Sequence, residues 1–152
     1  MLFAWAVRVA IVLVAAVAAV TEVRSRIVPD WLTLPAIALG LVAFATRMHW
    51  TGVELWALGV GLVAVPTVVP WLLGGYGGGD FKMSLAFGAL GGPLFGWWAL
   101  ALGVAGGLPL FAGWAVWRRT ARGQRSPFTG PPLAVALGVG AVAALRMVLV
   151  HA

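Results

Sequence analysis

The sequence predicts an all-α integral membrane protein, and three observations lead to this fold class. Hydrophobic residues make up 62% of the 152 residues and charged residues only 9%, whereas soluble domains contain about 25% charged residues. The hydrophobic residues gather in long runs, as membrane-spanning helices of about 20 apolar residues require. Alternating patterning typical of β-barrels is absent. We therefore expect one transmembrane domain over residues 1–152, with lipid as its solvent.

About six apolar runs are expected to form transmembrane helices, because backbone groups in lipid must find hydrogen-bond partners within their own segment. We place the helices near residues 2–21, 31–47, 53–73, 81–93, 95–117 and 131–150. The breaks between them are polar, glycine-rich or proline-containing, and read TEVRSRIVPD, RMHWTG, GGYGGG, LGGP and RRTARGQRSPFTGPP.

The distribution of charge predicts the orientation of these helices. If both termini lie on the outer, periplasmic side, the larger group of basic residues faces the cytoplasm, as the positive-inside rule requires. That group is Arg24, Arg26, Lys82, Arg118, Arg119, Arg122 and Arg125, against Arg8, Arg47 and Arg146 outside. The net charge of +6 is therefore explained by the orientation of the protein in the membrane and by contact of its basic residues with lipid headgroups. The sequence has no basic face interleaved with stacking aromatics, so it gives no indication of nucleic-acid binding.

The absence of cysteine excludes several kinds of chemistry. A chain with Cys 0 has no disulfides, no thiolate metal site and no cysteine nucleophile. The two histidines have no clustered partners, so no metal or other cofactor is expected. Chemistry must then come from other side chains, and in a membrane protein the acidic ones are the first candidates because ionisable groups are costly there.

Four carboxylates form the whole acidic set: Glu22, Asp30, Glu54 and Asp80. On the predicted topology, Glu54 lies at the outer face, where it suits the positive end of a helix dipole. The other three lie together at the cytoplasmic face. Two acids on one face suit acid–base chemistry, but structural roles are also open. Asp30 and Asp80 can cap helices, and Glu22 can pair with Arg26 one turn further on.

The glycine run before Asp80 is a second candidate feature of a functional site. Its backbone carries no Cβ atoms at Gly74, Gly75 and Gly77–Gly79. Such a stretch admits an extended peptide close to a carboxylate, which a protease requires. The alternative is a flexible loop or close helix packing through small residues.

Three sequence blocks resemble the motifs of the type IV prepilin peptidase family. Gly77-Gly78-Gly79-Asp80, followed by FKMSLAFG, is similar to the family's GxGD block, and Lys82 matches the lysine of that pattern. VPDWLTLP, at 28–35, resembles the family's [IL]-P-[DN]-x-L-T-L-P block. SPFTGPPLAVALG, at 126–138, resembles its closing block. The blocks occur in the family's order and together cover most of the chain.

The resemblance implies an aspartic endopeptidase of the inner, cytoplasmic membrane that removes the leader peptide of type IV pilin-like precursors at the cytoplasmic face. It places one catalytic aspartate at Asp80. The family's other catalytic aspartate lies eight residues before the [DN] position, which is Asp30 here. The matching position in this sequence is 22, and it holds glutamate. The catalytic pair is therefore expected to be Glu22 and Asp80, with Asp30 as an alternative or supporting acid. Gly77, Gly78, Gly79 and Lys82 are expected to line the substrate's approach.

The same resemblance implies a minimal form of the enzyme. Bifunctional family members carry a cysteine-rich insert that methylates the new pilin N-terminus, and this chain has neither the cysteines nor room for the insert. It is similar to the peptidases of the tight-adherence (Tad/Flp) pilus systems. The substrate's apolar segment is expected in the groove between the helices that carry Glu22 and Asp80. Two other functions stay open: a catalytically impaired scaffold that binds pilins, and a proton-coupled transporter or assembly subunit.

Overall fold

The computed structural model describes residues 2–25, 28–73, 76–120 and 133–150, and these are almost entirely helical. Four elements follow one another: α1 (Leu2–Ser25), α2 (Asp30–Leu72), α3 (Gly78–Thr120) and α4 (Leu133–Val150). Helix is the expected state for such apolar segments, because it satisfies the backbone hydrogen bonds locally. The predicted all-helical fold class is confirmed for the described part of the chain.

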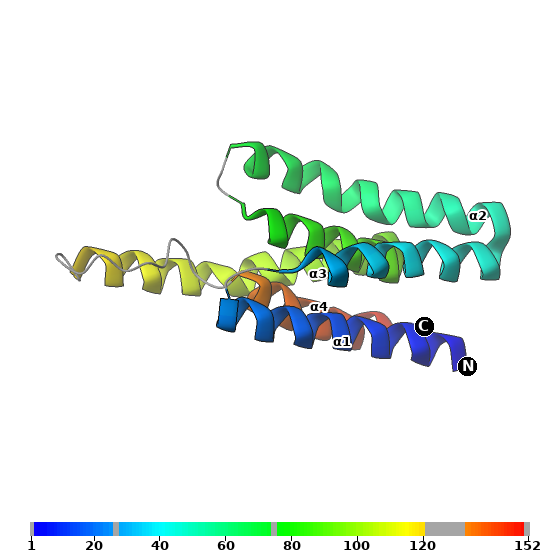
Figure 1. Ribbon diagram of the computed structural model, residues 1–152, viewed down its shortest axis with the longest axis horizontal. Helices are drawn as coiled ribbons and strands as arrows, with labels where there is room; N and C mark the ends of the chain where they lie inside the picture. The colour runs from blue at the N-terminus through cyan, green and yellow to red at the C-terminus, as the bar shows by residue number, and fades with distance from the viewer. Residues whose placement is uncertain (1, 26–27, 74–75, 121–132, 151–152) are drawn as a thin grey trace.

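Two of the elements are each made of two helical segments joined at one non-helical residue. In α2 the residue is His49, with φ 51° and ψ −126°. In α3 it is Gly92, with φ 78° and ψ −174°, followed by Pro93. A positive φ suits glycine, and proline is well accommodated at the first position of a helix. The chain reverses at both points (Figure 1), so the predicted loops RMHWTG and LGGP are much tighter turns than the sequence indicated.

The six helical segments form a layered bundle. The two segments of α2 pack mainly on α3, while α4 packs on α3 and also on α1. Direct contact between α1 and α3 is sparse, so α4 connects them. Both chain ends lie at one end of the bundle, and α1 ends at the opposite end, where α2, α3 and α4 begin (Figure 1). The last part of α3 extends beyond the other helices at that same end.

The interior is built from small residues that let the helices approach closely. Many of the buried side chains are alanine, and the largest that are fully buried include Phe87, Ile11 and Met83. At the contact of α2 with α3, a Cβ atom on Gly59 would lie 2.4 Å from the carbonyl oxygen of Gly88, and the converse distance is also 2.4 Å. Small residues at such contacts are typical of membrane helices, because lipid offers no hydrophobic force to press helices together.

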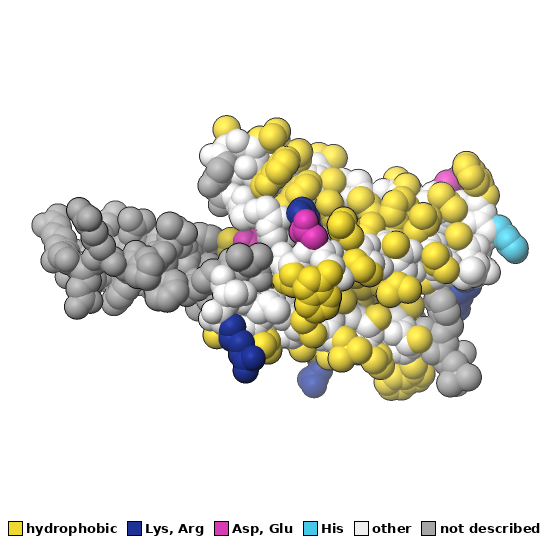
Figure 2. All heavy atoms as spheres, in the orientation of Figure 1, with side chains coloured by type: hydrophobic (Ala, Val, Ile, Leu, Met, Phe, Trp, Pro, Cys, Tyr) yellow, Lys and Arg dark blue, Asp and Glu magenta, His cyan; other side chains and the backbone are white. Residues whose placement is uncertain are grey.

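The outer surface is apolar, in contrast to that of a soluble protein. Large hydrophobic side chains are exposed along every element, among them Trp5, Leu39, Val65 and Leu94. They cover the flank of the bundle in Figure 2. In the part of the chain that the structure describes, three helices are long and apolar enough to cross a membrane, with spans at Trp5–Ser25, Asp30–Leu72 and Gly78–Pro109, and a shorter apolar helix covers Leu133–Met147. The protein is therefore a helical membrane protein.

The glycine contact between α2 and α3 yields a stability prediction. Gly59→Val should lower the thermal unfolding midpoint of the purified protein in detergent, because the new side chain would overlap the α3 backbone. Overpacking of this kind costs about 1–3 kcal/mol. Gly61→Val is the matched control, since a Cβ atom on Gly61 meets nothing within 4 Å. Equal midpoints for the two variants would contradict the close approach at Gly59.

Candidate active site

Glu22 lies in the last turn of α1 with its side chain buried, at 8% relative exposure. Its Oε2 accepts a hydrogen bond of 3.0 Å from the backbone N–H of Val135. Val135 belongs to the first turn of α4, where backbone N–H groups have no partner within the helix. The positive end of the α4 dipole also favours a negative charge at this position. Glu22 therefore joins the end of α1 to the beginning of α4.

Asp80 lies in the first turn of α3 and is also buried, at 9% relative exposure. Its carboxyl group lies within electrostatic range of that of Glu22, the other acid expected in the catalytic pair. Asp80 Oδ1 is one of two buried side-chain atoms in the described residues without a hydrogen-bond partner, the other being Thr33 Oγ1. An unpartnered buried oxygen is costly, and a substrate or water molecule that donates to Asp80 would remove that cost.

The three glycines before Asp80 have different surroundings. Gly77 and Gly78 are exposed, and a Cβ atom on Gly77 would lie 2.7 Å from Asp80 Oδ2. Gly79 packs inward, because a Cβ atom there would lie 2.9 Å from Cβ of Val28. The missing side chain at Gly79 thus lets α3 begin close to the segment before α2. Gly77 and Gly78 leave the backbone open beside the carboxyl group.

A second set of polar contacts holds the backbone of Asp80. Ser84 Oγ donates to the carbonyl oxygen of Asp80 at 2.8 Å, and Tyr76 Oη lies 2.8 Å from the same Ser84 oxygen. Because Ser84 donates its single hydroxyl hydrogen to the carbonyl oxygen of Asp80, Tyr76 is the donor in the bond between the two hydroxyl groups. Burial raises the pKa of Tyr76. The phenol therefore stays protonated and keeps donating.

The turn that carries Tyr76 is fixed at both ends. The N–H of Tyr76 donates to the carbonyl oxygen of Pro70 at 3.1 Å, and the N–H of Phe81 donates to that of Gly77 at 2.9 Å. The rings of Trp71 and Phe81 stack with centroids 5.0 Å apart and planes 8° apart. Sequence reasoning did not find Tyr76 and Ser84. The available signal was that the chain's single tyrosine lies inside the glycine stretch.

Asp30, the alternative acid, has different surroundings from Asp80. It is the first residue of α2, and its Oδ1 accepts a bond of 2.6 Å from Nζ of Lys82. The two side chains are 58% and 39% exposed, so the pair lies at the surface, where such pairs contribute about 0.2–1 kcal/mol. Lys82 therefore ties the beginning of α3 to that of α2. The Arg26 that the sequence suggested as a partner for Glu22 lies outside the described residues.

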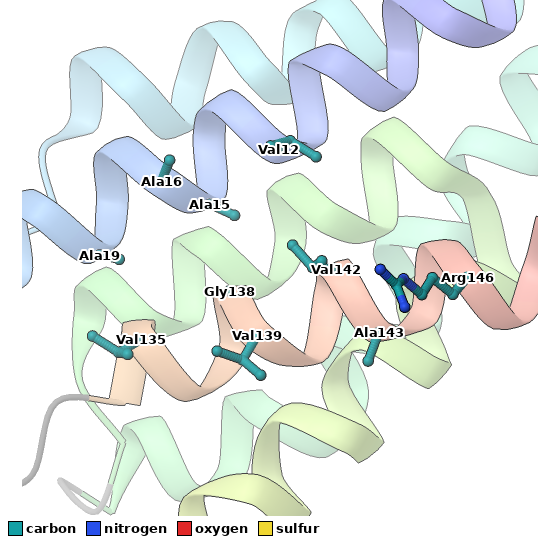
Figure 3. A pocket seen from close by; sticks show the side chains of 10 residues that line it. All are labelled: Val12, Ala15, Ala16, Ala19, Val135, Gly138, Val139, Val142, Ala143 and Arg146. Carbon is teal, nitrogen blue, oxygen red and sulfur yellow. The ribbon is translucent and has the colours of Figure 1, made fainter.

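A groove opens between α1 and α4 (Figure 3). Its volume is about 500 Å³. One end includes Val135, whose N–H bonds Glu22, and Ala19, one turn before Glu22 on α1; Arg146 lies further along α4. The rest of the lining is small or aliphatic and includes Val12, Ala15, Ala16, Gly138, Val139 and Val142. Within the described residues, no group of three or more histidine or acidic side chains is arranged to hold a metal ion.

Comparison with models of protein families assigns the chain to one family. The model of the type IV leader peptidase family matches residues 9–145, which include Glu22, Asp30 and Asp80. The protein belongs to this family of membrane peptidases, whose substrates are prepilins. In comparisons with curated proteins and with solved structures, no match was found.

The contact between Gly77 and Asp80 yields a prediction about peptidase activity. Gly77→Ala would place a Cβ atom 2.7 Å from Asp80 Oδ2 and force the carboxyl group to move. A shift of about 1 Å in a catalytic group costs on the order of 10²-fold in rate. If Asp80 is the catalytic acid that the sequence predicts, cleavage of a precursor should fall by one to two orders of magnitude. Gly78→Ala is the control, because its nearest neighbour would be Trp71 Nε1 at an ordinary 3.6 Å. A Gly77→Ala enzyme as active as the control would refute the proposed importance of this contact.

Proposed function

We propose that this protein is an aspartic endopeptidase that removes the leader peptide of type IV pilin-like precursors, with Glu22 and Asp80 as its catalytic pair. The observation that carries the proposal is the burial of both carboxyl groups close together, on helices that contact each other little. A membrane protein seldom places two acids in one buried site without a chemical use for them. The family match supports the reaction class.

Two neighbouring carboxyl groups can hydrolyse a peptide bond without a metal ion. Because two like charges at close range cannot both be ionised easily, such a pair shares one proton. The ionised member removes a proton from water, and the protonated member donates to the carbonyl oxygen of the scissile bond. The exposed backbone at Gly77 and Gly78 leaves space for an extended peptide beside Asp80. Loss of either carboxyl group should therefore stop the reaction.

We place the site at the cytoplasmic face of the inner membrane. In this arrangement α1, both segments of α2, both segments of α3 and α4 cross the bilayer, and both termini face the periplasm. The end of the bundle that carries Glu22, Asp30 and Asp80 then faces the cytoplasm, together with Lys82. Exposed Trp31 and Trp71 near this end, and Trp50 and Trp97 near the other, suit the two interfaces. Lipids are the expected surroundings, and no nucleic acid or cofactor is involved.

The apolar part of the substrate is proposed to lie in the α1–α4 groove. That groove begins at Val135, beside Glu22, so a helix lying in it would carry its adjoining peptide to the acids. Alanine and glycine in the lining permit close approach of a second helix. A larger hollow of about 930 Å³, lined by Glu54 and Trp97 among others, includes neither catalytic candidate. We expect no methylation of the product by this chain, which has no cysteine.

A catalytically impaired, pilin-binding scaffold is the competing function, because position 22 carries glutamate where the family resemblance implies aspartate. Co-expression with a candidate precursor, followed by gel shift and N-terminal sequencing, separates the two functions. A scaffold would bind the precursor and leave it full length.

Substitution of the acids tests the catalytic pair. Asp80→Asn and Glu22→Gln should abolish cleavage, since each removes one of the two carboxyl groups, while Glu22→Asp should retain it. Asp30→Asn is the control at an exposed acid and should cleave at close to the parent rate. Full processing by Asp80→Asn would exclude the aspartic mechanism, and loss of cleavage in Asp30→Asn alone would move the second acid to Asp30.

Filling the groove tests the position of the substrate helix. Ala16→Trp should slow cleavage of a full-length precursor in membranes, because the indole would occupy the groove. The same variant should cleave a short peptide that contains only the leader and the cleavage site at the parent rate. Leu13→Trp, at an exposed position of the same helix outside the groove lining, serves as the control. Equal rates on the full-length precursor would place the substrate helix elsewhere.

A further inference from the structure

We infer that the two acids have fixed and different roles: Glu22 is the ionised base that activates water, and Asp80 is the acid that holds the shared proton. The inference rests on the proposed function and adds to it the position of that proton. The beginning of α4 determines which acid is ionised, because it contacts Glu22. Val135 thereby becomes a positioning residue through its backbone N–H.

The surroundings of Glu22 favour its ionised form. The bond of 3.0 Å from the N–H of Val135 to Oε2 can be made only to an acceptor, and a carboxylate is a stronger acceptor than a neutral acid. The N–H groups of the first helical turn, together with the helix dipole, form a local positive potential. Glutamate is longer than aspartate by one methylene, which extends the reach of this side chain from α1 toward the first turn of α4.

The surroundings of Asp80 favour its protonated form. Asp80 Oδ1 is buried and has no hydrogen-bond partner among the described residues. A buried carboxylate without donors is far more costly than a neutral carboxylic acid. The bonds from Ser84 and Tyr76 support the backbone carbonyl of Asp80 and do not reach its Oδ1.

The other charged side chains that the structure describes at this end of the bundle do not reverse the assignment. On α1, Arg24 is exposed. On α3, Lys82 is bonded to Asp30 of α2 at 2.6 Å. Tyr76 stays neutral because burial raises its pKa. On α4, the charged residue of the described part is Arg146, eleven residues along the helix from Val135.

The assignment gives a balanced reaction. Glu22 takes a proton from water, the hydroxyl oxygen bonds to the carbonyl carbon, and Asp80 gives its proton to the carbonyl oxygen. The carbon–nitrogen bond then breaks as the nitrogen takes the proton held by Glu22. Asp80 recovers its proton from a hydroxyl of the tetrahedral intermediate as the new carboxyl group forms. Both acids return to their starting states.

Isotope-edited infrared spectroscopy on the unmutated protein can locate the proton. The chain has only four acidic side chains, two aspartates and two glutamates. The protein would be made by cell-free synthesis in lipid discs with carbon-13 in the carboxyl groups of either aspartate or glutamate. At pH 7 the C=O stretch of a protonated carboxyl group should shift with labelled aspartate, should not shift with labelled glutamate, and should persist in Asp30→Asn. A shift with labelled glutamate, or the absence of such a band, would overturn the inference even if the precursor is still cleaved.

Removal of the Val135 N–H tests the role of α4. Proline has no N–H and is tolerated in the first turn of a helix, so Val135→Pro deletes the donor to Glu22. The acidic limb of the pH–rate profile should move to higher pH, because Glu22 would then need less acid to become protonated. Val135→Ala keeps the N–H, so the acidic limb should stay at the parent pH even if the loss of side chain from the groove lining changes the rate. An unshifted profile in folded Val135→Pro protein would refute the role of α4. If that variant does not fold, the infrared measurement decides.

Discussion

The position of Glu22 relative to Asp80 depends on α4. Helices α1 and α3 contact each other little, and α4 packs on both. On one side the bond from Val135 to Glu22 joins α4 to α1. On the other, a Cβ atom on Gly140 would lie 2.3 Å from the backbone nitrogen of Gly103, so α4 and α3 meet backbone to backbone. A displacement of α4 would therefore separate the two acids, which lie on different helices.

The buried acids are supported by polar contacts at one end of an otherwise apolar bundle. Tyr76 and Ser84 hold the backbone at Asp80, Lys82 and Asp30 tie α3 to α2, and the first turn of α4 accommodates the charge of Glu22. Each of these contacts gives a polar group a hydrogen-bond or ion-pair partner. The apolar flank needs none of this support, because lipid is its solvent. Chemistry that requires both ions and water is thereby confined to the end of the bundle.

The packing of the bundle explains why its interior is made of small residues. In lipid, a large side chain gains little by moving from the surface to the interior, so close contact between helices supplies the association energy. Glycine and alanine at the α2–α3 and α3–α4 contacts allow this approach, while many of the leucine, valine and tryptophan side chains are exposed on the outside. The same property at the α1–α4 groove leaves a surface on which another helix can lie.

The sequence by itself determined the helices, the existence of breaks near His49 and Gly92, and the set of acids available for chemistry, while the tightness of those breaks appeared only in the structure. These follow from local properties: the length of each apolar run, the positions of glycine and proline, and the rarity of charge. The family motifs also indicated Glu22 and Asp80. Only the tertiary structure decided that Asp30 pairs with Lys82, that Gly79 packs on Val28, that Tyr76 supports Asp80 through Ser84, and that Val135 donates to Glu22. Several of these contacts join segments far apart in the chain, and their formation depends on helix packing and side-chain reach, which no local pattern records.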